Sequence, residues 1–137
     1  MKNIFITITF LSIFLVSCSS VPENIPTDLS ASELIQLAQS SFDKDNKKAA
    51  QAYYEAVIIR FGDNKSVLIE AEYEIAHMKI KEKNWDGAIP DLVRIISYYE
   101  NDTTRTLPYE YKTLAEIDLA KVPDYALEKA GINKEEL

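Results

Sequence analysis

Apolar residues recur at helical spacing in two long stretches of the chain, residues 45–61 and 83–99. In the first stretch they occupy positions i, i+3, i+4, i+7, i+8 and i+11, which is one face of a 3.6-residue helix. These residues are Ala50, Tyr53, Tyr54, Val57, Ile58 and Phe61. The second stretch repeats the pattern 38 residues later with Ala88, Leu92, Ile95, Ile96 and Tyr99. The two stretches are therefore predicted to be equivalent helices of a repeat.

Another apolar helix is predicted before each of these stretches. Leu37-Ala38 lies in the first and Ile75-Ala76 in the second, again 38 residues apart, and a third pair, Leu114-Ala115, follows after 39. A repeat of about this length with two helices per unit is typical of a helical solenoid. We therefore predict an all-α fold of two antiparallel helix hairpins followed by a capping helix.

Capping residues predict where the first two helices begin and end. Ser30 and Glu33 form an S-x-x-E capping box, in which each side chain bonds an amide that the helix leaves unpaired. Asp45 or Asn46 is expected to cap the second helix. Gly62 follows its last apolar residue, so we expect this glycine to end the helix in the left-handed conformation.

Proline and glycine delimit the later helices. The third helix is expected over residues 66–83, with an apolar surface wide enough to pack on both sides. Pro90 is expected in the first turn of the fourth helix, where its missing N–H matters least. Pro108 opens the fifth helix, and Gly131 closes a last short turn after Pro123. The inner residues of the fifth helix are predicted to be Tyr111, Leu114, Ala115 and Leu119.

The first 18 residues predict export and a lipid anchor. Lys2 precedes an apolar run from Ile4 to Val16 that is too short to span a bilayer as a mature helix. Leu15-Val16-Ser17-Cys18 resembles the lipobox of bacterial lipoproteins. That resemblance implies removal of residues 1–17 and acylation of Cys18, and Ser19 after it favours the outer membrane. An ordinary signal peptide that contains a cysteine is the alternative.

The rest of the chain divides into three parts. Residues 18–29 hold the lipidated cysteine and a Pro-containing tether, expected to let the folded part stand off the lipid surface. Residues 30–131 form the helical domain, and residues 132–137 are expected to be a frayed tail.

Composition excludes several classes of function. The 137 residues carry a formal net charge of −7 without a Lys/Arg block, which argues against nucleic-acid binding. The single cysteine excludes an internal disulfide and a multi-thiolate metal site. No nucleophile-and-base set can be assembled, and we expect Glu70 and Glu74 to lie on a solvated helix face. We therefore predict no enzyme activity, no cofactor and no metal.

The hairpins resemble tetratricopeptide repeats in their small residues and in Trp85. The small residues are Ala38 and Ala76 in the first helices and Ala50 and Ala88 in the second. The resemblance implies a concave groove that binds an extended peptide. Its lining would be Ile35, Gln39, Phe42, Tyr73, His77, Ile80, Lys81, Lys112 and Glu116. Core packing is the alternative for Phe42, Tyr73 and Ile80, and a plain surface position is the alternative for His77.

Residues 15–101 further resemble the amino-terminal part of the BamD family, tetratricopeptide lipoproteins of the β-barrel assembly machinery. The features that carry this are the lipobox, the tether VPENIP, and the runs ELIQLAQSSFDKDNKKAAQAYYEAVIIRF and EAEYEIAHMKIKEKNWDGAI. The resemblance implies a periplasmic scaffold on the outer membrane that binds the assembly pore subunit and unfolded barrel precursors. A general periplasmic adaptor for cell-wall or transport machinery is the alternative.

Overall fold

The computed structural model describes residues 20–133, and within that range the chain forms six α-helices and no strand. The helices are α1 (Ala31–Asp43), α2 (Lys47–Phe61), α3 (Lys65–Lys81), α4 (Trp85–Glu100), α5 (Tyr109–Ala120) and α6 (Asp124–Lys129). The predicted all-α fold is confirmed. The predicted signal peptide, the lipobox with Cys18, and residues 134–137 lie outside the described residues. Within residues 20–133 no helix combines the length and apolarity needed to cross a bilayer.

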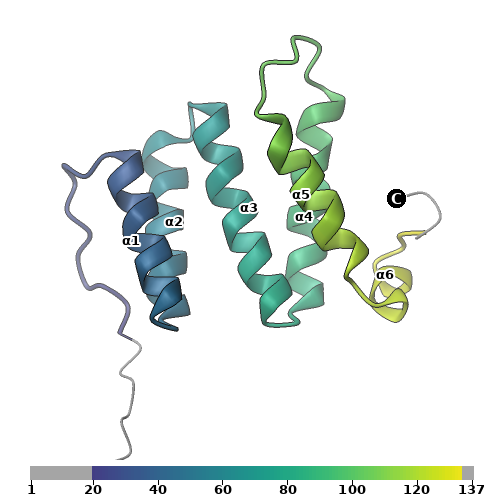
Figure 1. Cartoon of the computed structure of the whole chain (residues 1–137), viewed down its shortest axis with the longest axis horizontal. Coiled ribbons are helices and arrows are strands. Elements are labelled where there is room, and N and C mark those ends of the chain that lie inside the picture. Colours follow the sequence, from purple (N-terminus) through teal and green to yellow (C-terminus); the bar gives the residue numbers. More distant parts are fainter. Residues whose placement is uncertain (1–19, 134–137) are drawn as a thin grey trace, which may run out of the picture.

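Successive helices run antiparallel, with α1, α3 and α5 in one layer and α2 and α4 behind them (Figure 1). Each helix packs mainly on its neighbours in the chain, and α5 also packs on α3. Two apolar clusters result. The first cluster joins α1, α2 and one side of α3, and the second cluster joins the other side of α3 to α4, α5 and α6.

Helix α3 uses four faces, and two opposite ones enter the two clusters, as the wide apolar surface predicted. The face in the second cluster consists of Ile69, Tyr73, Ala76 and Ile80. The face in the first cluster consists of Ala71, Ile75 and Met78. On a third face Glu72 and Lys79 form ion pairs with Arg94 and Asp91 of α4. The fourth face carries Glu70, Glu74, His77 and Lys81, and we call it the central face.

The turns inside the two hairpins have the same geometry. Asp45 and Lys83 both have a left-handed backbone, with φ of 58° and 57°. The amides of Asn46 and Asn84 donate to the carbonyl five residues earlier, at 2.8 and 2.9 Å, which closes the preceding helix. The same two asparagines cap the helices that follow. The 38-residue repeat therefore includes the turn and not only the apolar stripes.

Two predictions at glycine and proline are wrong. Gly62 has φ of −64°, so its backbone is right-handed. A Cβ atom at this position would lie 2.5 Å from the carbonyl oxygen of Ile58, so close approach is what favours glycine here. Pro90 lies in the second turn of α4, which begins at Trp85. Because Pro90 is exposed, water can reach the helix surface where its N–H is missing.

Helix α5 covers the second hairpin, as a capping helix was expected to do, but its orientation differs from the prediction. Leu114 remains 37% exposed, while Ala115 and Leu119 are buried. Gly131 has the predicted left-handed backbone, with φ of 73°. The next amide, Ile132, donates to Leu127 and its side chain packs against the second cluster. The prediction of a frayed tail is therefore wrong for Ile132.

The segment from residue 20 to 29, which we call the tether, does not stand off from the folded part. Ile25 and Leu29 pack against the first cluster. The guanidinium of Arg60 donates to the carbonyls of Ile25 and Pro26, at 2.9 and 2.6 Å. Figure 1 shows the tether running alongside the first hairpin from its lower turn to the start of α1. The expectation of a free spacer is wrong because these contacts dock the tether on the body.

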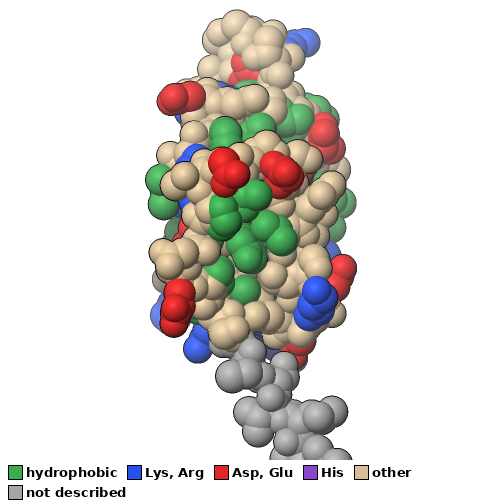
Figure 2. Space-filling model, turned by 90° about the vertical axis from the view of Figure 1, so that its left-hand side faces the viewer, with side chains coloured by type: hydrophobic (Ala, Val, Ile, Leu, Met, Phe, Trp, Pro, Cys, Tyr) green, Lys and Arg blue, Asp and Glu red, His purple; other side chains and the backbone are tan. Residues whose placement is uncertain are grey.

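The first hairpin ends the array on one side. Figure 2 looks onto the end made by the tether, α1 and α2, and shows apolar side chains gathered at its centre with acidic side chains above them. Leu37 on α1 is 37% exposed, whereas Ile75, its repeat equivalent on α3, is 9% exposed. The difference follows from position, because α3 has a preceding hairpin to pack against and α1 has only the tether.

Candidate functional site

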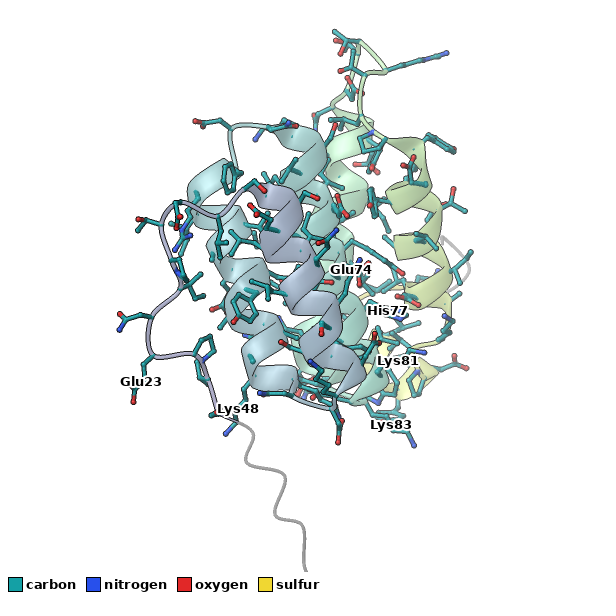
Figure 3. The ribbon with its side chains drawn as sticks, turned by 60° about the vertical axis from the view of Figure 1, so that its left-hand side comes forward. Glu23, Lys48, Glu74, His77, Lys81 and Lys83 are labelled. Carbon is teal, nitrogen blue, oxygen red and sulfur yellow. The ribbon has the colours of Figure 1, made fainter. Side chains whose placement is uncertain are left out.

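The central face of α3 is the part of the molecule where polar and titratable side chains from different helices meet. Glu74, His77 and Lys81 lie along α3 between α1 and α5 (Figure 3). Their spacing of three and four residues places them on one stripe of the helix. Lys81 is exposed, while the side chain of His77 is 25% exposed.

A buried carboxylate on α5 supports this face from behind. Asp118 is 1% exposed, and its Oδ2 accepts hydrogen bonds from the Tyr73 hydroxyl at 3.1 Å and from His77 Nδ1 at 2.6 Å. Its Oδ1 accepts a bond from the Lys121 ammonium at 2.7 Å. Both carboxylate oxygens are thus bonded, as a buried charge requires.

The charge of Asp118 is stabilised by its donors. Burial on its own would raise the pKa of this carboxyl, but the hydrogen bonds from Lys121, His77 and Tyr73 outweigh it and hold the pKa below the ordinary value of 3.8. An ionised carboxylate only accepts hydrogen bonds, so His77 must donate through Nδ1. Nε2 is then the hydrogen-bonding atom of the ring that remains for another partner.

Aromatic contacts fix the same junction. The rings of Tyr73 and His77 are stacked with centroids 5.7 Å apart, and Tyr73 also lies 5.7 Å from the ring of Tyr111 on α5. Burial, and then the nearby charge of Asp118, raise the pKa of Tyr73. Its hydroxyl is therefore a neutral hydrogen-bond donor and not a source of phenolate.

Glu70 and Glu74 are not the fully solvated pair that the sequence suggested. Both side chains are partly buried, and burial raises the pKa of each. Tyr111 hydrogen-bonds to Glu70, and the charge of His77 opposes the upward shift at Glu74. The two carboxylates therefore belong to the junction of α3 with α5 and carry a desolvation cost that a cationic or hydrogen-bond-donating ligand would offset.

The structure separates the residues predicted to line one groove. Ile35 and Phe42 pack against the first cluster, while Tyr73 and Ile80 are buried in the second cluster. Packing is thus the role the structure gives these four. Gln39 and Lys81 are exposed, and His77 belongs to the Asp118 junction, so neither alternative considered for His77 describes it fully.

Lys112 and Glu116 do not lie with the other predicted groove residues. They line a cavity of about 420 Å³ on the side of α5 that faces α4 and the carboxyl-terminal segment, together with Val93, Ile96 and Ile132. The placement is wrong because α5 does not keep the orientation that the 39-residue spacing implies. It presents Tyr111 and Asp118 to α3 instead.

Sequence reasoning missed Asp118 altogether. A signal was available, because Asp118 is three residues after Ala115 and directly precedes Leu119, so it falls on the buried face of α5. A carboxylate at such a position needs donors from the helix it faces. Tyr73 and His77 on α3 are spaced four apart, as such a pair of donors would be.

The Asp118–His77 pair resembles part of a hydrolase triad, so its surroundings matter. Among the described residues the only hydroxyl bonded to His77 is that of Tyr73, which is itself buried. Within residues 20–133 no three His, Cys, Asp or Glu side chains gather closely enough to hold a metal ion. The arrangement therefore positions an imidazole and a lysine on a surface, and the geometry is that of a binding face.

Comparisons with known proteins identify one relative. An uncharacterized protein of Treponema pallidum (strain Nichols) is 39% identical to this chain over 121 residues, which is 86% of this chain and 48% of that protein. The chain thus spans about half the length of the relative it matches. No protein-family model matches the chain, and no solved structure matches it.

Proposed function

We propose that this protein is a non-enzymatic, lipid-anchored scaffold that binds a partner protein through the central face of α3. The observation that carries the proposal is the buried Asp118, which bonds Tyr73, His77 and Lys121 at once. These bonds fix the α3–α5 junction before any partner arrives, which lowers the ordering cost of binding. Carboxylates, an imidazole and an amine along one helix suit the backbone and side chains of an extended peptide.

The setting of this scaffold follows from the resemblances in the sequence. Cys18 is acylated after removal of residues 1–17, and the helical domain lies on the periplasmic face of the outer membrane. The similarity to the BamD family favours β-barrel assembly, with the pore subunit and unfolded barrel precursors as partners. A general periplasmic adaptor for cell-wall or transport machinery is the second candidate, because it would use the same face.

Co-purification from detergent-solubilised membranes tests the partner. We expect the wild-type protein to recover the barrel-assembly pore subunit and Glu74→Lys, on the central face, to lower that recovery about tenfold, as loss of a central contact does. Glu116→Lys makes the same charge change on the α4 side of α5 and should leave recovery unchanged. Circular dichroism should show equal helicity in all three proteins.

The outcomes separate the candidate functions. Recovery of cell-wall or transport proteins in place of the pore subunit would favour the adaptor. Equal recovery of partners by wild type and folded Glu74→Lys would contradict binding through the central face.

Mass spectrometry of the protein from membranes tests the anchor. We expect the amino-terminal peptide to begin at Cys18 and to carry acyl chains on the thiol and the new amino group, because more than one chain is needed for stable attachment. Cys18→Ala should prevent both cleavage at this site and acylation. An unmodified amino-terminal peptide that begins elsewhere would refute the lipidation proposal.

A further inference from the structure

The docked tether determines where the chain enters the folded body. Its first described residue, Ser20, accepts a hydrogen bond from the side chain of Asn46 at 3.1 Å. Asn46 lies in the α1–α2 turn, and the Arg60 bonds hold the tether further along α2. The amino-terminal residues therefore leave the body beside the α1–α2 turn, at the end that also carries the α3–α4 turn (Figure 1).

This point of exit is close to the proposed anchor. Cys18 precedes Ser20 by two residues. Since an extended residue spans at most ~3.6 Å, the anchor can lie no more than about 7 Å from Ser20. That distance is shorter than the Debye length of about 8 Å at physiological ionic strength, so charges at this end interact with lipid headgroups without full screening.

The charges at this end are mostly exposed lysines. Lys44, Lys48, Lys81 and Lys83 are exposed, and none of them forms an ion pair with a described residue. Figure 3 shows Lys48 beside the departing chain and Lys81 and Lys83 at the same end of the molecule.

The acidic residues of the two turns are largely neutralised. Lys47 lies 3.8 Å from Asp45 and 3.5 Å from Glu82, and Lys129 lies 2.8 Å from Asp86. Asp43 is the acidic residue of these turns that has no ion pair among the described residues. The turn end therefore offers four free ammonium groups against one free carboxylate, although the whole chain has a net charge of −7.

We propose that Lys44, Lys48, Lys81 and Lys83 form a membrane-facing edge that rests on anionic lipid headgroups and fixes the orientation of the scaffold. The inference rests on the proposed lipid anchor at Cys18. The docked tether sets the distance, and the four lysines bind the lipid phosphates electrostatically. The opposite end, with the loop between α4 and α5, then points away from the membrane, and the central face of α3 opens sideways along it.

Lysine acylation on vesicles tests this orientation. The mature chain from residue 18 is coupled through its single thiol to a maleimide lipid in vesicles of phosphatidylglycerol and phosphatidylethanolamine, then acylated and analysed by mass spectrometry. We expect Lys48, Lys81 and Lys83 to react severalfold more slowly than in the protein free in solution. Lys65 is the matched control, since it is exposed at the other end of α3, about 24 Å from Lys81 at 1.5 Å per residue.

Two further conditions separate the contributions. Phosphatidylcholine vesicles should give weaker protection of the same lysines, because anionic headgroups are absent. Arg60→Ala should reduce the difference between Lys48 and Lys65, because it releases the tether; an undiminished difference would overturn the role of the tether. Equal protection of Lys48, Lys83 and Lys65 in the wild type would overturn the proposal. Because the lipid is attached chemically, this result does not depend on natural acylation, which the peptide mass from membranes tests separately.

Discussion

At the scale of single residues, Asp118 is the position where the chain departs furthest from an ordinary apolar core. Burying an ionised carboxylate costs several kcal/mol unless hydrogen bonds and opposite charges replace its water. Here Tyr73, His77 and Lys121 supply those bonds. The role of the cluster is therefore to hold α5 at a defined position on α3, which an apolar contact would specify less strictly.

Replacing this carboxylate should lower the stability of the fold. Asp118→Asn removes the charge that Lys121 and His77 bind, and a hydrogen bond to a charged group contributes about 1.5–3 kcal/mol. We expect a loss of this order in urea unfolding at neutral pH, followed by circular dichroism. Glu116→Gln is the control on the same helix, since its carboxylate is 44% exposed and forms a surface pair with Lys112.

The pH dependence of this loss has a definite sign. The pKa of Asp118 is lower in the folded protein than its ordinary value of 3.8, so the folded state releases this proton more readily than the unfolded state does. The contribution of Asp118 to stability is therefore complete above pH 3.8 and fades as the pH falls through the lower folded-state pKa. The difference between wild type and Asp118→Asn should shrink below pH 3.8, and a constant difference would contradict the assignment.

At the scale of helices, local signals predicted the fold well. The Ser30–Glu33 capping box is present, with the Ser30 amide 2.9 Å from the Glu33 carboxylate, and Asn46 caps α2. The two-sided packing of α3 follows from its wide apolar surface. These predictions succeeded because capping and apolar periodicity depend on residues within one or two turns of each other.

The candidate site was harder to predict because it depends on how helices are rotated against one another. The repeat pattern placed Lys112 and Glu116 with His77, but α5 turns Tyr111 and Asp118 toward α3. A spacing of 39 in place of 38 residues already changes the face that a helix presents by about 100°. The docking of the tether depends on Arg60, a contact across 34 residues that no local pattern encodes.

At the scale of the whole molecule, α3 makes the two hairpins one cooperative unit. Its opposite faces belong to different apolar clusters, so neither cluster keeps its packing if α3 unfolds. Neighbouring repeats of a solenoid are coupled in this way through their shared interfaces. The same continuity would carry a load from the membrane-facing edge to the central face without a flexible joint.

This coupling predicts that damage to the first cluster is felt in the second. Leu34 is fully buried in the first cluster, and Leu34→Ala should cost about 2–5 kcal/mol. Trp85, the single tryptophan, packs against the second cluster, so its fluorescence reports on the other hairpin. We expect urea midpoints from fluorescence and from circular dichroism to fall together, whereas Ile59→Ala, at a side chain that is 82% exposed, should move neither. If the circular dichroism transition shifts while the Trp85 transition stays in place, the hairpins unfold independently and α3 does not couple them.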